Sequence, residues 1–211
     1  MIIAVDGPAA SGKGTLAAGL ARHFALPHLD TGLLYRAVGL AAGADDGTAA
    51  FEQRAIAAAK RLDPTHLAVG RLGTAEVALL ASRVARIPGV RAALVDFQRS
   101  FAAQPVGAVL DGRDIGTRIA PDADVKLFIT ADPSVRAARR TAQLKARGVA
   151  ADEAAILAQI VGRDAADRDN PAGAFYPATD AHLLDTTELD IDAALSAAIG
   201  IVEAAIAGRS G

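Results

Sequence analysis

Apolar residues along the chain follow two repeating patterns. Short apolar runs bounded by turn residues are typical of buried parallel strands, and apolar positions that recur every three to four residues are typical of helices with one buried face. Strands are predicted at IIAV (2–5), VGAVLDGRD (106–114), VKLFIT (125–130) and HLLDTT (182–187). Helices are predicted after residue 12, at 49–62, over 76–104 with a break at Pro88-Gly89, at 134–147, at 152–167 and at 191–207.

The alternation of strands with helices predicts the fold class. Parallel strands joined by helices form a sheet that is covered on both faces. We therefore expect an α/β protein with three layers and a mostly parallel central sheet. The length of 211 residues suits one domain with small appendages. Residues 62–74 are expected to form no regular element, because Pro64, Gly70 and Gly73 interrupt them.

The loop after the first predicted strand reads GPAASGKGT, residues 7–15. Gly7, Gly12 and Lys13 match the phosphate-binding pattern G-x-x-x-x-G-K-[ST], in which glycines let amides point at phosphates and the lysine adds charge. The next residue is Gly14, and the hydroxyl follows at Thr15, turned by about 100° around the helix. It is not expected to hold Mg²⁺ as in GTPases. The predicted ATP-binding residues are Gly7, Pro8, Ala9, Ala10, Ser11, Gly12, Lys13, Gly14 and Thr15.

Composition and charge narrow the choice of partners. The net charge is −2, from 22 basic and 24 acidic residues, so no global field attracts nucleic acid or an anionic membrane. There is no cysteine, which excludes disulfides, thiolate metal sites and cysteine nucleophiles. We expect no targeting segment at the N-terminus, and we expect no apolar run that approaches the ~18 residues of a membrane span. We expect a soluble, cytoplasmic protein that binds neither nucleic acid nor membrane.

Three further motifs follow the loop: LDTGLLYR (29–36), VLDGRDIGT (109–117) and HLLDTT (182–187). Together with GPAASGKGT, and in this order over nearly the whole length, they resemble the bacterial cytidylate kinases, which are P-loop nucleoside monophosphate kinases. The resemblance implies an enzyme that transfers the γ-phosphoryl group of ATP to CMP and dCMP with the help of Mg²⁺. It divides the single domain 1–211 into a core (1–30, 105–135 and 180–211), an acceptor-binding region (31–104) and a lid (136–179).

The resemblance also assigns residues to the acceptor phosphate. Thr31, Tyr35 and Arg36 match phosphate contacts of the family, and a helix that begins near Thr31 can turn the other two towards one side. Asp30 or Thr31 also suits a helix N-cap, which leaves a purely structural role open for Thr31. Arg113 matches a further phosphate contact of the family. The alternative is that Arg113 belongs to a turn with a solvated ion pair and binds no ligand.

Base recognition and metal binding are assigned to residues around the same motif. Asp114 would accept a hydrogen bond from the amino group of cytosine, the pairing expected of a carboxylate with that donor. Ser82 and Arg91 match family positions that complete base selection, although in isolation they are ordinary helix residues. Asp111 ends a predicted strand and is similar to the acid that orients water around Mg²⁺, the metal being held mainly by phosphates and water.

The second half of the chain carries the predicted lid. Arg136 and Arg140 lie four residues apart on one helical face with Arg139 beside them, where the family has arginines that neutralise the transferring group. A basic helix face is usually just solvated, so the spacing by itself is weak support. Arg163 would reach phosphate, and Asp167 the ribose hydroxyls of the acceptor. The predicted catalytic residues are Lys13, Arg136, Arg140 and Arg163.

The chain departs from its relatives at two places. Asn170 stands where the family usually has another phosphate-binding arginine, and the hypothesis is that Arg168 supplies the missing charge. The segment at 64–74 is shorter than in many relatives, which predicts a reduced acceptor region with altered affinity rather than altered chemistry.

Other functions remain as alternatives to the kinase of CMP. A P-loop kinase of another small acceptor, such as UMP, AMP or a hydroxy acid, shares most of these features. A GTPase switch is disfavoured because its guanine-reading motif needs asparagine, and the single asparagine, Asn170, lies in another context. An ATP-driven regulator would not need the acceptor-side residues. A monomer is expected by analogy with two-substrate enzymes that close a lid.

Overall fold

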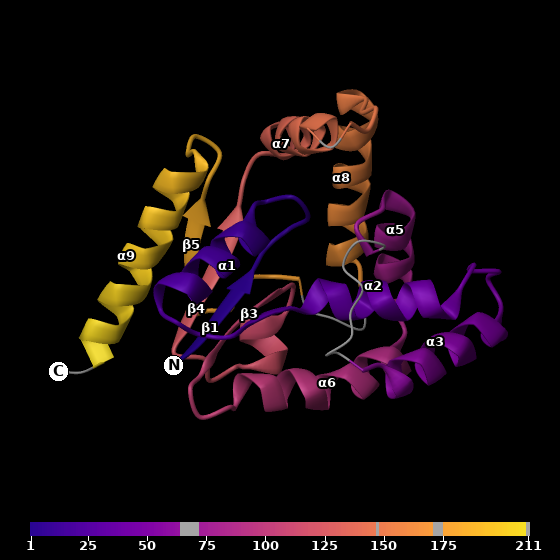
Figure 1. Cartoon of the computed structure of the whole chain (residues 1–211), viewed down its shortest axis with the longest axis horizontal. Coiled ribbons are helices and arrows are strands. Elements are labelled where there is room, and N and C mark those ends of the chain that lie inside the picture. The colour runs from indigo at the N-terminus through magenta and orange to yellow at the C-terminus, as the bar shows by residue number, and fades with distance from the viewer. Residues whose placement is uncertain (64–71, 147, 171–174, 210–211) are drawn as a thin grey trace.

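The computed structural model describes residues 1–63, 72–146, 148–170 and 175–209. Within these residues five strands form one sheet in which every pair is parallel, in the order β2-β3-β1-β4-β5. The strands are β1 (Ile2–Asp6), β2 (His28–Asp30), β3 (Ala108–Gly112), β4 (Val125–Thr130) and β5 (His182–Asp185). The strand that leads into the phosphate-binding loop therefore lies at the centre of the sheet (Figure 1).

Helices occupy most of the remaining described chain. They are α1 (Lys13–His23), α2 (Thr31–Ala42), α3 (Ala49–Arg61), α5 (Ala75–Val84), α6 (Pro88–Ala102), α7 (Pro133–Ala146), α8 (Glu153–Arg168) and α9 (Ile191–Arg209), with a π-helical turn η2 (Ile115–Ile119). Pro88 begins α6 at the predicted break, because a proline fits the first helical position, where its missing amide would have no intrahelical partner. The Asp152 carboxylate accepts a hydrogen bond from the Ala154 amide and caps α8.

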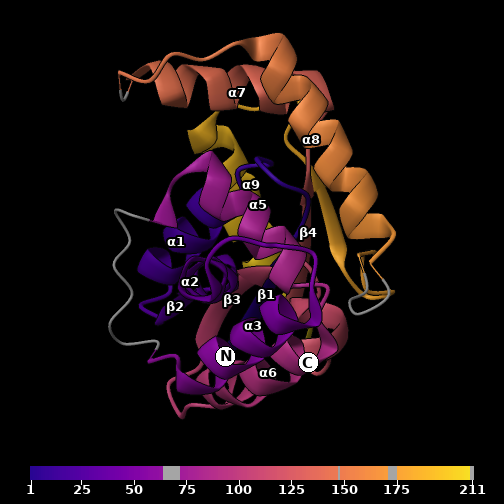
Figure 2. The same ribbon diagram turned by 90° about the vertical axis from the view of Figure 1, so that its right-hand side faces the viewer.

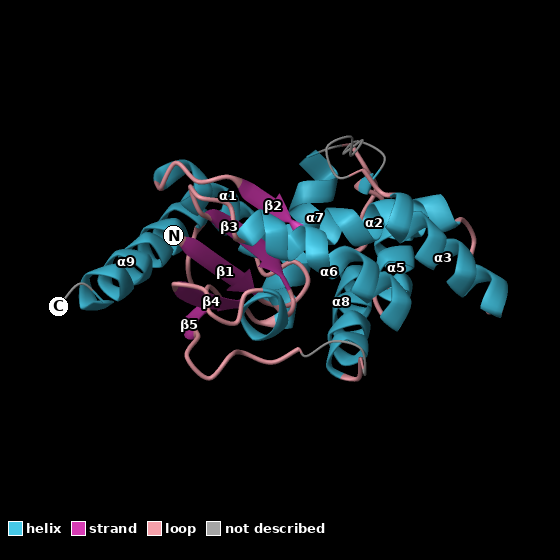
Figure 3. Ribbon diagram, turned by 90° about the horizontal axis from the view of Figure 1, so that it is seen from below, coloured by secondary structure: helices cyan, strands magenta, loops and turns pink. Residues whose placement is uncertain are grey.

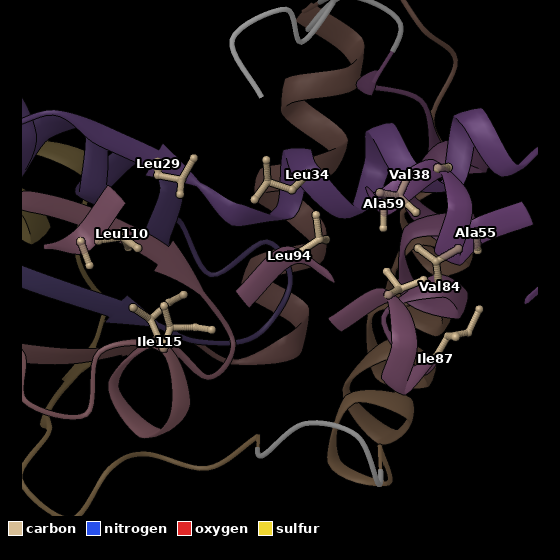
Figure 4. Close-up of a cluster of buried hydrophobic side chains, with 14 of the residues drawn as sticks. Leu29, Leu34, Val38, Ala55, Ala59, Val84, Ile87, Leu94, Leu110 and Ile115 are labelled. Carbon is tan, nitrogen blue, oxygen red and sulfur yellow. The ribbon is translucent and has the colours of Figure 1, made fainter. Parts of the chain in front are cut away.

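Two hydrophobic clusters show that the sheet is covered on both faces. Alternate residues of β1, Ile3 and Val5, pack on one face against α1 and α9. Ala4 and Leu110 point to the other face, where they meet α2, α6 and η2, and this cluster extends to α3 and α5 (Figure 4). Figure 3 shows the helices on either side of the sheet. The predicted α/β fold with a parallel central sheet is confirmed.

The elements nearest the site project from the core in two directions. Helices α2, α3, α5 and α6 extend to one side of the sheet, and α7 and α8 stand above the loop that follows β1 (Figures 1 and 2). Arg86, just after α5, donates to the Ala166 carbonyl of α8 over 3.3 Å, so the two groups of helices touch. The predicted irregular segment 62–74 falls mostly outside the described residues.

The C-terminal helix corrects one expectation. Residues Ile191–Gly208 of α9 are long and apolar enough to cross a membrane, with a mean hydropathy of 1.7 over 18 residues, so the judgement that no apolar run approaches this length was too strong. Such a helix is weak support for a span when judged by length and composition alone. Here Ala194, Ala198 and Val202 of α9 pack into the core against α1 and the sheet.

Candidate active site

The loop after β1 has the geometry of a phosphate-binding loop. Gly7 has φ +151°, and a Cβ there would lie 2.1 Å from the Ile129 carbonyl oxygen of β4, so only glycine fits. Gly12 adopts the left-handed conformation, φ +88°, immediately before α1. The turn therefore presents the N-terminal amides of α1, and with them the positive end of its dipole, to an anion.

Position 14 brings the loop against the end of β3. A Cβ at Gly14 would lie 3.7 Å from the Asp111 Oδ2 atom, so the carboxylate occupies the space beside the position that carries a hydroxyl in the common motif. Thr15, which carries the hydroxyl in this chain, is exposed on α1. This arrangement agrees with the predicted rotation of the hydroxyl away from the usual metal position.

One pocket opens between the loop, α2, α5, the end of β3 and α8, at the carboxyl ends of the parallel strands, where open α/β sheets bind ligands. The predicted site residues that line it are Ala9, Ala10, Lys13, Gly14, Thr31, Tyr35, Arg36, Ser82, Arg91, Asp111, Arg113, Asp114, Arg163 and Asp167. The predicted residues that do not line it are Gly7, Pro8, Ser11, Gly12, Thr15, Arg136 and Arg140.

A buried ion pair between Arg91 and Asp114 lines the same pocket. Arg91 at the start of α6 donates from Nη2 to the Asp114 carboxylate, and its guanidinium lies 5.8 Å from the centre of the Tyr35 ring. Burial raises the pKa of Asp114, and the charge of Arg91 opposes that rise. Ser82 donates to the Ala78 carbonyl of its own helix over 3.2 Å. An arginine, a carboxylate and a hydroxyl thus line the same pocket.

Carboxylates and a histidine surround the end of β3. His28 Nε2 lies 2.7 Å from Asp111 Oδ1, and the Thr31 hydroxyl donates to the Asp111 carbonyl over 2.9 Å. Asp30 takes the N-cap position of α2, so Thr31 is the first helical residue and both supports the backbone and lines the pocket. Burial, and then the charge of Asp111, raise the pKa of Asp30.

Besides Arg91, four cations line the same cavity: Lys13, Arg36, Arg113 and Arg163. Desolvation lowers the pKa of Lys13 to about 7, with a further contribution from the charge of Arg113, while Asp111 and Asp30 oppose the change. The pKa of Arg163 is lowered to about 10 by burial and by Arg113. Burial also lowers the pKa of Arg36. Crowded, partly desolvated cations favour an anionic ligand, because it would compensate the cost of keeping them together.

Two of these cations are already engaged by the protein. Arg113 Nε donates to Asp167 Oδ2 of α8 over 2.8 Å, and Arg36 Nη1 donates to the Leu72 carbonyl over 2.7 Å. Arg163 Nε, by contrast, is buried without a hydrogen-bond partner in the described structure. An incoming phosphate would therefore compete with Asp167 for Arg113 and could satisfy Arg163 directly.

Of the two arginines predicted for the lid, Arg136 is held by the protein itself. Arg136 is 3% exposed and donates from Nε to the Ala131 carbonyl, from Nη1 to the Ala9 carbonyl (both 2.9 Å), and from both Nη atoms to Asp164. It therefore fastens α7 and α8 to the phosphate-binding loop and does not reach the pocket. Arg140 donates to Gln143 on the surface of α7.

The neighbouring Arg139 binds Thr186 of the HLLDTT motif. Its guanidinium donates to the Thr186 hydroxyl (3.1 Å), the Thr186 carbonyl (2.6 Å) and the Leu189 carbonyl (2.9 Å). The Thr186 hydroxyl in turn contacts the Ser11 carbonyl at 3.5 Å. The motif thus helps to hold the loop after β5 beside the phosphate-binding loop.

The position of the missing family arginine is also visible. Asn170 lines the pocket and donates from Nδ2 to the Ala85 carbonyl over 3.4 Å. Arg168 is exposed and does not line the pocket, so the structure does not bring it to the place of the missing charge. Among the pocket residues that the sequence did not indicate is Phe175, whose ring packs 6.0 Å from that of Phe128. No pattern in the sequence marks this phenylalanine, because an isolated aromatic residue in a loop has many structural uses.

A phosphate-binding loop at the central strand of a parallel sheet, facing a second wall of arginines and acids, defines the class of P-loop kinases that act on small acceptors. The family model for cytidylate kinase matches residues 3–204. The chain belongs to the cytidylate kinase family. This membership makes it a nucleoside monophosphate kinase, a transferase that uses ATP to phosphorylate CMP, and the alternative acceptors are not favoured.

Relatives of known name agree over the whole chain. The cytidylate kinase of Bradyrhizobium diazoefficiens is 57% identical over 210 residues, which cover 100% of this chain and 99% of the relative. That of Afipia carboxidovorans is 55% identical over 212 residues, covering 99% and 100%. A crystal structure of an uncharacterized protein from Eubacterium ventriosum is 17% identical with a TM-score of 0.57, covers 96% of this chain and 98% of that one, and supports the fold alone.

Proposed function

We propose that the pocket lined by the loop after β1, the end of β3 and α8 is where the γ-phosphoryl group of ATP passes to CMP, and to dCMP. The observation that carries this proposal is the meeting of two sets of side chains in one cavity. Lys13 and the loop amides suit the triphosphate, and Arg36, Arg113 and Arg163 suit the acceptor phosphate. The acceptor phosphate is itself an anionic nucleophile, so catalysis consists of positioning and charge neutralisation.

The ion pair Arg91–Asp114 would recognise the base. Both side chains are buried, and the Arg91 Nε atom has no hydrogen-bond partner in the described structure. Asp114 can accept from the amino group of cytosine, and Arg91 can donate to the O2 and N3 acceptors. Uracil presents a carbonyl in place of the amino group, which would leave a buried carboxylate facing an acceptor. Such a mismatch costs ~1–3 kcal/mol, or roughly a ten- to hundredfold preference for CMP.

Asp111 fits the role of orienting water around Mg²⁺. It is buried, one of its oxygens is held by His28, and the other faces the beginning of α1 at Gly14. Among the described residues no three His, Asp or Glu side chains converge as a metal site, so a magnesium ion here would take its other ligands from phosphates and water. Bound there, Mg²⁺ would supply charge neutralisation on the phosphates.

The lid would exclude water and complete the acceptor site. Asp167 is paired with Arg113 in the structure, and the proposed contact of Asp167 with the ribose requires CMP to exchange the carboxylate for its phosphate at Arg113. We propose that the core, acceptor-binding region and lid move relative to each other in this step, since an open site would let water attack ATP. The enzyme would act as a monomer in the cytoplasm.

A coupled assay of ADP release with a panel of nucleoside monophosphates tests the proposal. We expect CMP and dCMP to be phosphorylated, UMP and AMP to be poor acceptors, and the activity to require Mg²⁺. A preference for UMP or AMP, or rapid ATP turnover without any acceptor, would contradict it.

A further inference from the structure

One buried carboxylate near the site has no part in the proposed mechanism. Asp6 is the last residue of β1, is 6% exposed and precedes Gly7 of the phosphate-binding loop. Its Oδ1 atom accepts a hydrogen bond from the Ile115 amide (2.9 Å), and its Oδ2 atom accepts one from the Gly116 amide (2.8 Å). Burial raises the pKa of Asp6 to about 6 while the two amides lower it, so the side chain is a carboxylate at neutral pH.

The two amides open the π-helical turn η2, which starts directly after Asp114. The first amides of a helix have no partner within the helix and attract a negative charge. A side chain of the turn itself usually fills this role, but none does so at the N-terminus of η2. Asp6 fills it from the central strand, 109 and 110 residues away in sequence. The chain can therefore turn at Asp114, two residues after the end of β3, where φ is −141° and ψ is 33°.

The turn is clamped from a second side. A Cβ at Gly116 would lie 3.1 Å from Lys126 Cδ of β4 and 3.5 Å from Asp6 Oδ2. The backbone after Asp114 is thus packed between β1 and β4, and a methyl group at Gly116 would require the Lys126 side chain to shift by a few tenths of an ångström. A shift of this backbone would move the Asp114 carboxylate relative to Arg91, its partner on α6.

We propose that Asp6 is a positioning residue for base selection: by holding the amides of Ile115 and Gly116, it fixes the Asp114 carboxylate at the place where cytosine is recognised. This inference rests on the base-reading role proposed for Asp114. Asp6 would then link two parts of the site, because it precedes the phosphate-binding loop and also holds the turn after Asp114. The donor loop and the base-reading carboxylate are set at a constant separation by one side chain.

The test is the choice between CMP and UMP in the variant Asp6→Asn. An asparagine has nearly the same shape but offers one acceptor oxygen, and its NH₂ group would face one of the two amides. We expect the ratio of kcat/KM for CMP to that for UMP to fall ~3- to 10-fold, mainly through a higher KM for CMP, because one hydrogen bond is lost and the turn shifts. The KM for ATP should change less than twofold.

A matched control separates positioning from general stability. Asp124 also accepts a backbone amide, that of Ile2 over 2.7 Å, but at the opposite end of β1. Asp124→Asn should lower the midpoint of urea unfolding and leave the CMP to UMP ratio unchanged. Should Asp6→Asn fail to fold, Gly116→Ala takes its place, because the added methyl group presses on the same turn with Asp6 intact.

The possible results distinguish the two claims. If Asp114→Asn abolishes base selection but the folded Asp6→Asn variant keeps it, or Gly116→Ala keeps it in its place, Asp6 is structural only and the inference is wrong. If Asp114→Asn leaves selection intact, the proposed role of Asp114 fails and the inference fails with it. A reduced ratio in both Asp114→Asn and the turn variant, with a normal ratio in Asp124→Asn, supports the inference.

Discussion

Two ion pairs made by buried arginines, one on the acceptor wall and one at the base of the lid, are built differently. Arg91 pairs with Asp114, lines the pocket and keeps a buried Nε atom without a hydrogen-bond partner in the described structure. Arg136 pairs with Asp164 away from the lining of the pocket, and its Nε and Nη1 atoms also donate to the carbonyls of Ala131 and Ala9. Arg91 keeps a buried nitrogen for a ligand, whereas every nitrogen of Arg136 already donates to the protein.

The difference shows that the role of such a pair depends on the other partners of the arginine. A pair with free donors at a cavity can rearrange when a ligand arrives. A pair whose arginine already donates from every nitrogen holds the protein segments together. Removing one partner leaves the charge of the other uncompensated. The contacts of Arg91 are those that the proposed recognition role requires, and the contacts of Arg136, which the sequence predicted to be catalytic, fasten the lid helices to the phosphate-binding loop.

Arg136→Ala should have the largest effect. It leaves the half-buried Asp164 carboxylate without its partner and two carbonyls without their donor, which should cost ~2–4 kcal/mol of the free energy of unfolding, measured by urea denaturation. Base preference should be unchanged. Arg140→Ala is the matched control, because Arg140 lies one turn further along α7, and it should destabilise by less than ~1 kcal/mol. Undiminished stability of Arg136→Ala together with a ~10³–10⁵-fold lower kcat would instead identify a transition-state arginine.

Asp114→Asn should affect recognition more than stability. The preference for CMP over UMP should fall ~10- to 100-fold, since an amide can also donate to the uracil carbonyl. Initial rates of ADP release with each acceptor give the ratio. Asp164→Asn, at the other pair, should lower stability and leave the ratio as it is. An equal loss of activity with CMP and with UMP in Asp114→Asn would mean that the Arg91–Asp114 pair, too, has only a structural role.

Lys13 extends the comparison to a cation that faces the cavity. With a pKa of about 7 in the free enzyme, Lys13 is charged below this pH and loses its proton above it. Phosphates raise the pKa of a nearby ammonium, so ATP binding should take up protons at pH 8, and the affinity for ATP should fall as the pH rises through 7. Calorimetry in two buffers of different ionisation enthalpy measures the uptake. Lys13→Arg stays charged and corrects for protons taken up by ATP itself; equal uptake in both proteins would contradict the prediction.

The smallest effect is expected at the edge of the lid. Arg168 is exposed, so Arg168→Ala should leave CMP turnover unchanged and stability within ~0.5 kcal/mol. Asn170→Arg should lower the KM for CMP, because this side chain lines the pocket. Steady-state kinetics of both variants provides the test. A clear loss of CMP turnover in Arg168→Ala would restore the hypothesis that Arg168 replaces the missing arginine.

The sequence predicted those parts of the site that are contiguous in the chain. GPAASGKGT follows a strand with a clear apolar pattern and VLDGRDIGT contains the end of another, so their residues could be placed at one edge of the sheet. Ser82 and Arg91 were found only through the resemblance, because nothing local distinguishes them from other helix residues. The roles of Arg136 and Asp6 depend on partners 127 and 109 residues away, and no local pattern reports such contacts. Strand β2 has three residues, too few for a period to show.

If Arg113 binds the acceptor phosphate as proposed, its contact with Asp167 makes CMP binding an exchange rather than a simple addition. The phosphate would displace a carboxylate, and the displaced carboxylate would regain a partner only if the sugar offers one. The energetic contributions of the two halves of the nucleotide are therefore not additive. A phosphate without its nucleoside would break the pair and give Asp167 no new partner, so the ion pair would weaken the binding of inorganic phosphate relative to that of CMP.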